Sequence, residues 1–150
     1  MVSNEEISVN KRNGRGKESL NIEKIHSMVG FATEGITGVS ASHVEMNSGI
    51  QFFDGVSTAD IQQILIKSAN DLITLENPNY QYVAARLLLF QLRKQLFHKL
   101  WDHPKFIDHI KTLIDKGLYD KDILVNYDES EIDRMGMWID HERDYNFTYA

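Results

Sequence analysis

The segment from Val9 to Lys24 holds the side chains best suited to chemistry in this chain. It gathers five cationic side chains around a glycine-containing turn: Lys11, Arg12, Arg15, Lys17 and Lys24. Asn21, near its end, is a residue type that commonly begins a helix. Backbone N–H groups at a helix start, next to lysine and arginine, form a ready site for phosphate. The segment therefore predicts binding of a small phosphorylated molecule.

Several other kinds of chemistry find no support in the sequence. The chain has no cysteine, which excludes disulfides, cysteine-type zinc sites and a thiol nucleophile. Its histidines show no HExxH or paired ligand spacing, so we expect no metal site. The run 14–17 lacks the spacing of a Walker loop, and 141–144 has no glycine-rich loop or DFG to make it a kinase loop. We therefore expect a nucleotide-sensing module, and a stand-alone ATPase is disfavoured because no general base accompanies the basic loop.

The elements that must position these cations begin with a hairpin. Residues 7–11 alternate apolar and polar side chains and predict a short strand, and 17–20 predict the returning strand. Asn13-Gly14 between them is a strong hairpin turn pair. Asn21 then caps a helix over residues 22–34, in which Ile22, Ile25, Val29 and Ala32 have helical spacing.

Three further helices are predicted up to residue 100. Ser40 is expected to cap a helix that ends near residue 50. Ser57 and Asp60 have capping-box spacing and begin a helix over residues 58–75. Asn77-Pro78 ends that helix and starts another over 79–100, which is apolar on most sides and belongs in the middle of a bundle.

A change of domain is predicted near residues 101–105. Beyond it we expect one helix over residues 106–117 and a second that Asp128 caps and that ends near residue 141. An extended tail follows, in which Tyr145, Phe147 and Tyr149 lie on one side. Those aromatic side chains need a cover, so we interpret 101–150 as the incomplete helical start of a further domain. Residues 9–100 are the predicted nucleotide-binding domain, and 1–8 a flexible N-terminus.

Composition limits the class of partner. The chain has 150 residues, 42% of them hydrophobic, and a net charge of −6, so it can bury a core as an acidic protein. It has no apolar run long enough for a membrane span and no signal-peptide pattern, and we expect a soluble, cytoplasmic protein. A local basic site on an acidic protein suits a small anion better than nucleic acid.

Several motifs in order resemble one family. The first are Val9-x-Lys11-Arg12-x-Gly14 and Glu18-x-x-Asn21-x-x-Lys24-Ile25, followed by Ile50 to Ile61, Tyr80 to Arg86 and Leu92-Arg93-Lys94. Beyond residue 100 come Phe106 to His109, Gly117-x-Tyr119-Asp120 and Ile139 to Tyr149. The set resembles the N-terminal ATP-cone region of a class I (aerobic) ribonucleoside-diphosphate reductase large (alpha) subunit.

The resemblance implies a mainly α (α+β) fold, a four-helix bundle under a lid of two or three short strands. It implies an allosteric site that controls the overall activity of deoxyribonucleotide synthesis, where ATP activates and dATP in many members inhibits. Mg²⁺ is expected to accompany the phosphates. Carried over by position, the nucleotide-binding residues are Lys11, Arg12, Glu18, Ser19, Leu20, Asn21, Ile22, Glu23, Lys24, Thr58 and Lys94. The implied partners are the reductase small (beta) subunit and other large subunits, with no nucleic acid and no membrane.

This chain also departs from the family. Relatives inhibited by dATP often carry histidine where this chain has Gln62 and Gln91, and the hairpin is longer near Arg15-Gly16; either change is expected to weaken discrimination between ATP and dATP. The family's reduction chemistry uses cysteines on a barrel, which this chain lacks. We therefore expect the chain alone to have no catalytic residues and no reductase activity.

Plainer interpretations stay open. The hairpin cations are also consistent with solvated surface charges, Asn21 and Thr58 with simple helix caps, and Lys94 and Gln62 with ordinary helix surface. The alternative function is a degenerate cone that acts as a protein–protein docking module. A cone-containing transcriptional repressor is disfavoured because it needs a zinc ribbon, which needs cysteine.

Overall fold

A computed structural model of the chain describes residues 7–11, 16–49, 51–99 and 103–149. The chain divides into two compact units, Met1–Gln91 with Asp144–Ala150, and Leu92–Arg143. The described residues are mostly helical and include a small sheet of three strands, which confirms the predicted mainly α class. None of the described helices has the length and apolar character that crossing a membrane requires.

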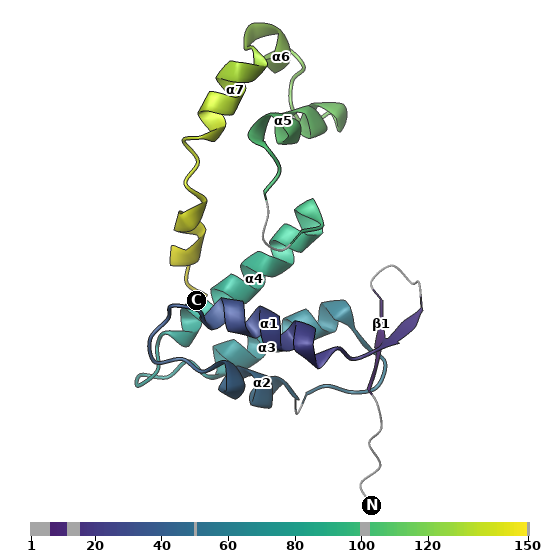
Figure 1. Ribbon diagram of the computed structural model, residues 1–150, viewed down its shortest axis with the longest axis vertical. Helices are drawn as coiled ribbons and strands as arrows, with labels where there is room; N and C mark the ends of the chain where they lie inside the picture. Colours follow the sequence, from purple (N-terminus) through teal and green to yellow (C-terminus); the bar gives the residue numbers. More distant parts are fainter. Residues whose placement is uncertain (1–6, 12–15, 50, 100–102, 150) are drawn as a thin grey trace, which may run out of the picture. The chain divides into compact units, whose positions relative to one another are not determined.

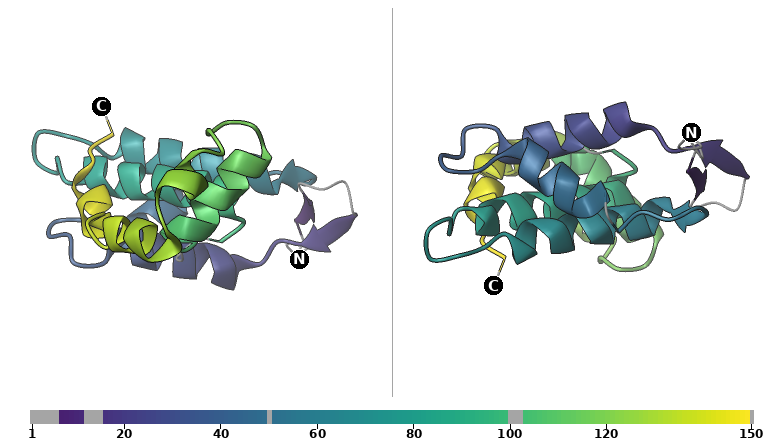
Figure 2. Two further views of the ribbon diagram at one scale, coloured as in Figure 1. Left: turned by 90° about the horizontal axis from the view of Figure 1, so that it is seen from above. Right: turned by 90° about the horizontal axis from the view of Figure 1, so that it is seen from below.

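The sheet joins segments that are far apart in the sequence. Strand β1 (Ser8–Asn10) pairs antiparallel with β2 (Lys17–Ser19) and parallel with β3 (Val56–Ser57). Val9 lies opposite Glu18 on one side and Val56 on the other, and both valines are buried. The two predicted hairpin strands are confirmed, while their predicted Asn13-Gly14 turn lies outside the described residues. Figure 2 shows the sheet beyond one end of the helices.

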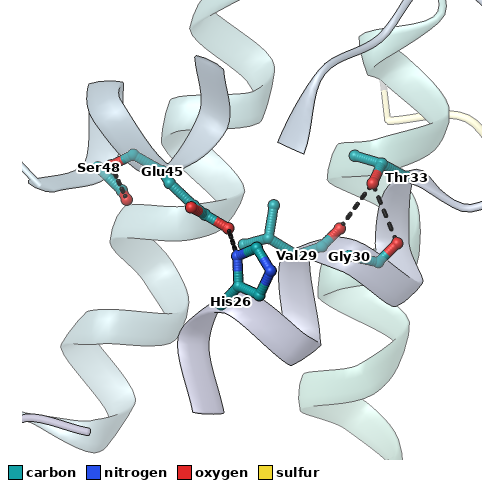
Figure 3. A network of polar contacts seen from close by, with 6 residues as sticks. All are labelled: His26, Val29, Gly30, Thr33, Glu45 and Ser48. Atoms are coloured by element: carbon teal, nitrogen blue, oxygen red, sulfur yellow. Dashed lines mark hydrogen bonds and ion pairs between the residues drawn. The ribbon is translucent and has the colours of Figure 1, made fainter. Parts of the chain in front are cut away.

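Four helices follow the predicted order: α1 (Ile22–Thr33), α2 (Ala41–Gly49), α3 (Thr58–Asp71) and α4 (Tyr80–Phe97). Helix α2 packs against both α1 and α3 (Figure 1). The α1–α2 contact includes a polar side-chain contact at 2.8 Å between His26 Nδ1 and Glu45 Oε1, seen in Figure 3. The buried positions in these helices recur at helical spacing, with Val29, Val44 and Leu65 fully covered.

Side chains tie α4 to α1 and α3. The guanidinium of Arg86 donates to the carbonyl oxygen of Glu34 at 2.7 Å, just past the end of α1. The amide of Gln62 on α3 donates to the carbonyl oxygen of Leu87 at 2.9 Å. Leu87 and Phe90 themselves are almost completely buried, so α4 contributes much of the core of the first unit, as its apolar sequence predicts.

The starts of α1 and α3 were predicted correctly, but the role of Thr58 and the end of α3 were not. Asn21 accepts from the Lys24 backbone N–H at 2.9 Å, which confirms the cap of α1. Ser57 and Asp60 form the predicted capping box, but this makes Thr58 the first residue inside α3, so its prediction as the cap is wrong. Helix α3 ends at Asp71 rather than 75, since Leu72 already turns its N–H to the carbonyl oxygen of Ala69.

The second unit is built around α5 (Phe106–Asp115), α6 (Ile123–Asn126) and α7 (Glu129–Gly136). Helices α5 and α7 pack together and share a small core of Ile107, Ile110 and Ile132. Asp128 forms a capping box with Glu131, which confirms the predicted start of α7. Its predicted continuation to 141 is wrong, because α7 ends at Gly136, and the short α6 was not predicted.

The prediction of an extended aromatic tail is wrong at Tyr145. This residue lies in a 3₁₀ helix, η1 (His141–Asn146). The guanidinium of Arg86 sits 5.1 Å from the centre of the Tyr145 ring, a cation–π contact. Further along, Tyr149 donates its backbone N–H to the carbonyl oxygen of Gln81 at 3.1 Å. The tail residues of the first unit are therefore held on α4 by specific contacts.

Candidate functional site

The first part of the candidate site is the hairpin. The N–H of Lys11 donates to the carbonyl oxygen of Gly16 at 3.2 Å, which continues the β1–β2 pairing. The ammonium of Lys11 lies 3.0 Å from Oε2 of Glu18 on β2. That hydrogen bond, with the positive charges of Lys11 and Lys24, lowers the pKa of Glu18. Lys11 and Ser19 are exposed, so the hairpin presents both charge and a hydroxyl to solvent.

The second part is the start of α1, which follows directly from β2. The N–H of Leu20 donates to the carbonyl oxygen of Ile7 at 2.8 Å and fixes the chain just before the helix. Residues 21–24 are all exposed. The first turn of a helix presents N–H groups that have no partner within the helix, and here Lys24 adds a full positive charge. This is the arrangement that binds anions at helix N-termini.

Ile22 differs from the apolar positions that follow it in α1. Ile25, Val29 and Ala32 are buried as predicted, whereas 70% of Ile22 is exposed. The helical stripe therefore begins at Ile25 rather than at Ile22. An exposed branched side chain at the start of α1 offers an apolar surface beside the cations, of the kind that the flat face of a base can cover.

The third part is the start of α3, which the sheet brings to the same place. Strand β3 leads directly into α3, and its partner β1 also pairs with β2, which leads into α1. The N-terminal ends of α1 and α3 therefore both extend from one three-stranded sheet. Thr58, half-buried, lies in the first turn of α3.

Polar contacts that the sequence did not reveal hold this sheet in place. Asp54 accepts from the N–H of Ser8 at 2.9 Å and from its hydroxyl at 2.6 Å. These two hydrogen bonds, the hydroxyl first, lower the pKa of Asp54. Asn10 donates from its side-chain amide to the carbonyl oxygen of Gly55 at 2.7 Å. Gly55 has a φ of 81°, a left-handed conformation that favours glycine. The sequence alone did not indicate these bonds between residues 54–55 and β1.

Two predicted site residues are not brought to this sheet by the described contacts. Arg12 lies outside the described residues. Lys94 is an exposed residue of α4 and falls within the second unit, so its convergence with Lys11 stays a prediction.

The glutamines that depart from the family pattern are engaged in bonds between helices. Gln62 is only 6% exposed, so its interpretation as a surface residue is wrong; its amide finds a buried carbonyl acceptor on α4. Gln91 accepts from the side-chain amide of Gln63 at 2.9 Å. Gln63, which sequence reasoning did not single out, thereby fixes the orientation of Gln91.

Chemically, the assembled residues can bind and orient an anion. The sheet and the two helix starts supply ammonium groups, backbone N–H groups and hydroxyls, with Glu18 as an acceptor for a hydroxyl or an amino group. The described part of this site shows no activated nucleophile beside a base, the arrangement that covalent catalysis requires.

Comparisons with known proteins agree with this geometry. Residues 7–95 match the family described as the ATP cone domain. The chain is 45% identical over 96% of its length to the ribonucleoside-diphosphate reductase subunit alpha of Buchnera aphidicola from Acyrthosiphon pisum. It is 44% identical over 98% of its length to ribonucleoside-diphosphate reductase 1 subunit alpha of Escherichia coli. It is 40% identical over 96% of its length to the alpha subunit of Enterobacteria phage T4. The chain spans 19% of the length of each of these curated relatives.

Proposed function

This chain belongs to the ATP-cone family, and on that premise we propose that it binds ATP or dATP as the regulatory region of a ribonucleoside-diphosphate reductase alpha subunit. The observation that carries the proposal is the meeting of two helix N-termini and a basic hairpin at one small sheet. In this role the chain itself carries out no reduction. It controls the overall activity of deoxyribonucleotide synthesis by the protein that contains it.

In the proposed complex, helices α1–α4 act as a four-helix bundle and the three strands as its lid. Lys11, Arg12, Lys24 and Lys94 bind the phosphates, together with the first-turn N–H groups of α1 and α3. Glu18 to Glu23 surround the nucleoside, with Ile22 against the base and Thr58 as a further hydroxyl. Mg²⁺ binds the phosphate oxygens and keeps several waters.

The ion pair between Lys11 and Glu18 is compatible with this role. Exposed ion pairs contribute little to stability because water screens them, so a triphosphate can recruit Lys11 at small cost. Glu18 then remains ionised, because its pKa is lowered, and can accept a hydrogen bond from a ribose hydroxyl or an adenine amino group.

Titration calorimetry of the purified chain with Mg·ATP and with Mg·dATP tests the proposal. Micromolar binding is expected. A difference between the affinities for ATP and dATP shows whether the site, with Gln62 and Gln91 in place of histidine, still distinguishes the two nucleotides. Removing one charge-assisted phosphate contact costs about 1.5–3 kcal/mol, so Lys11→Ala and Lys94→Ala are each expected to weaken binding by about 10- to 100-fold.

Lys67→Ala is the matched control, since Lys67 is an exposed lysine on α3 outside the proposed site. It removes the same charge from the chain and is expected to leave the affinity within about twofold of the unchanged protein. If all three variants bind equally well, the assignment of Lys11 and Lys94 is wrong.

A second candidate function is a docking module that has lost nucleotide binding. The hydrogen bonds of Gln62 and Gln91 favour it, because both amides are already committed to contacts between α3 and α4. It predicts no heat from either nucleotide with a folded chain. In the leading proposal, the partners of the domain are the reductase beta subunit and other alpha subunits, and its location is the cytoplasm.

A further inference from the structure

Three histidines line one cavity of the Leu92–Arg143 unit. The cavity measures about 380 Å³, and His103, His109 and His141 all contribute to its wall. His103 precedes α5, His109 lies within α5, and His141 follows α7 at the start of η1. The sequence predicts no metal site here, because His103 and His141 are far apart along the chain. The fold nevertheless places these two side by side.

His103 and His141 form a pair of potential metal ligands. Their rings stack with centres 3.8 Å apart and planes inclined by 13°. One nitrogen of each ring lies within 4.8 Å of the other. Phe97 meets the His103 ring edge-on, with ring centres 6.2 Å apart, and such contacts hold a ring in a defined position. At least one imidazole of the pair is therefore positioned in advance of any ligand.

Asp144 supplies a carboxylate beside His141. It lies three residues further along the same 3₁₀ helix, η1. Side chains three residues apart in a 3₁₀ helix lie on the same face, and here an oxygen of Asp144 is within 4.8 Å of the His141 nitrogen. Two imidazole nitrogens and one carboxylate oxygen are a ligand set that binds Zn²⁺ and leaves a fourth position for water.

Zinc binding at this pair requires a small movement of one ring. The lone pair of an imidazole nitrogen lies in the ring plane, so two nearly parallel rings do not point at one ion. His141 is exposed whereas His103 is half-buried, so the His141 ring is the one that can turn without displacing packed neighbours. Since Zn–N bonds are about 2.0–2.1 Å long, the donor atoms need to approach each other by roughly 1–2 Å.

The local charge favours a cation at this position. Lys105 and Asp133 also line the cavity and carry opposite charges. Residues 140–144 contain three carboxylates and one arginine, so the segment that carries His141 is negatively charged. A positive ion is attracted to such a segment and a phosphate is repelled from it.

The second unit has a physical reason to bind a metal. Its buried core is small and is built around Ile107, Ile110 and Ile132. Small folds with little apolar core are commonly stabilised by a structural metal ion. We propose that His103, His141 and Asp144 bind one Zn²⁺ ion, which joins the segment before α5 to the turn after α7. This inference does not depend on the proposed binding of nucleotide.

Titration calorimetry of the purified chain with ZnCl₂, without nucleotide, tests the proposal. One Zn²⁺ per chain is expected, with a micromolar Kd. MgCl₂ should give no heat at the same concentrations, because Mg²⁺ prefers oxygen ligands and keeps its waters. Loss of a residue that only orients a metal ligand costs about 10- to 100-fold in affinity, so His103→Asn, which removes a ligand itself, should cost about tenfold or more.

His98→Asn is the matched control for that variant. His98 is an exposed histidine just past the end of α4 in the same unit, and its φ of 58° is a conformation that asparagine also adopts. It should leave the affinity for Zn²⁺ unchanged. Equal binding by the unchanged protein and by His103→Asn would place the ion elsewhere, for example at His26 and Glu45, and would overturn the proposal.

Imidazole resonances of the unchanged protein provide a test that does not depend on a variant folding. In ¹H–¹⁵N spectra, Zn²⁺ is expected to shift the ring nitrogens of His103 and His141 and to leave those of His26 and His98 in place. Shifts confined to other histidines, or no shift at saturating ZnCl₂, would overturn the assignment.

Hydrogen exchange then tests whether the ion stabilises the unit. A ligand at 100 times its Kd lowers the population of an open state that does not bind it by about 100-fold. Amides of α5 and α7 that exchange through opening of the unit should slow by up to that factor with ZnCl₂. Zn²⁺ binding that leaves their exchange unchanged would overturn the proposed stabilising role.

Discussion

At the scale of single residues, Lys11 and Glu18 show how the lid handles charge. The two side chains neutralise each other at 3.0 Å, so the hairpin presents less net positive charge than its composition indicates. An exposed pair of this kind is weak, and a ligand with several negative charges can compete for the lysine. In the proposed complex, this competition favours a triphosphate over a ligand with a single negative charge.

Gln62 is the residue whose burial has the clearest consequence for stability. Its amide is 2.9 Å from the carbonyl oxygen of Leu87 in a dry environment between α3 and α4. Gln62→Ala is expected to lower the free energy of unfolding by about 1–3 kcal/mol, because it removes the hydrogen bond and leaves a cavity. Urea unfolding followed by circular dichroism measures the change.

Gln63→Ala is the matched control for that substitution. Gln63 is the next residue on α3 but is exposed, and its bond to Gln91 lies at the surface. We expect a change within about 0.5 kcal/mol, as for most surface substitutions. An equal loss in both variants would contradict a structural role for the buried amide.

Sequence reasoning succeeded for residues whose role is local. Asn21 and Asp128 act as helix caps because a cap needs only its own side chain and the next few backbone groups. It failed for Gln62, because a polar side chain on an amphipathic helix is normally exposed. The carbonyl group that accepts its hydrogen bond and so allows its burial belongs to Leu87 on α4, 25 residues away. The sequence does not show that Gln62 and this carbonyl group meet.

At the scale of elements, the α5–α7 contact depends on one glycine. A Cβ on Gly136 would overlap Phe106, so Gly136→Ala is expected to force the helices apart and to destabilise the second unit by about 1–3 kcal/mol. Hydrogen exchange of α5 and α7 amides measures the effect. The cavity of about 380 Å³ that Phe106 and Gly136 help to line is expected to change shape in the same variant.

Gly30→Ala provides the contrasting case. Gly30 also lies within a helix, α1, but a Cβ there meets nothing within 4 Å. Alanine has a higher helix propensity, so this substitution is expected to stabilise α1 by up to about 1 kcal/mol. If both glycine variants change stability in the same direction, close packing at Gly136 is not the cause.

The bond between Asp54 and Ser8 makes the attachment of β1 dependent on pH. The pKa of Asp54 is lowered in the folded chain by the hydrogen bonds from Ser8. The stabilisation is therefore complete above the unfolded pKa of about 3.9 and is lost as pH falls through the lower folded value. The difference in unfolding free energy between the unchanged protein and Asp54→Ala should shrink as the solution is acidified below about pH 4.

Hydrogen exchange at the backbone amides of Val9 and Asn10 tests whether the pH-dependent loss of stability occurs in the sheet. Asp71→Ala is the control, since Asp71 is an exposed aspartate at the end of α3. A difference for Asp54→Ala that stays constant through the acid range would contradict the assignment. The same titration with Asp71→Ala is expected to show no such convergence.

The hairpin and most helices could be predicted from the sequence because their patterns are local. The resemblance allowed for a third strand, but the sequence pattern did not locate it. Strand β3 has two residues, and it exists because Val56 pairs with Val9 across a long separation in the chain. The tail shows the same limit. Alternating aromatics predict an extended strand, yet the contact of Tyr145 with Arg86 holds that residue in a 3₁₀ helix instead.

At the scale of the whole molecule, charge is distributed unevenly along the chain. The segment 9–24 is basic, whereas the segment 128–142 is acidic, within a chain of net charge −6. Anionic ligands are therefore attracted to the segment 9–24 and repelled from the segment 128–142. This distribution favours the segment 9–24 over the segment 128–142 as the place where the proposed nucleotide binds.

The same distribution predicts where a nucleotide stabilises the chain. A ligand at 100 times its Kd stabilises the folded state by about 2.7 kcal/mol, so Mg·ATP is expected to raise the midpoint of thermal unfolding of the first unit by several degrees. Hydrogen exchange should slow at residues 17–24, at 56–61 and around Lys94, and should be unchanged at 118–139. Equal protection at residues 118–139 would show that the nucleotide stabilises the whole chain rather than the sheet alone. The Lys11→Ala variant should show less protection at the sheet, in proportion to its loss of affinity.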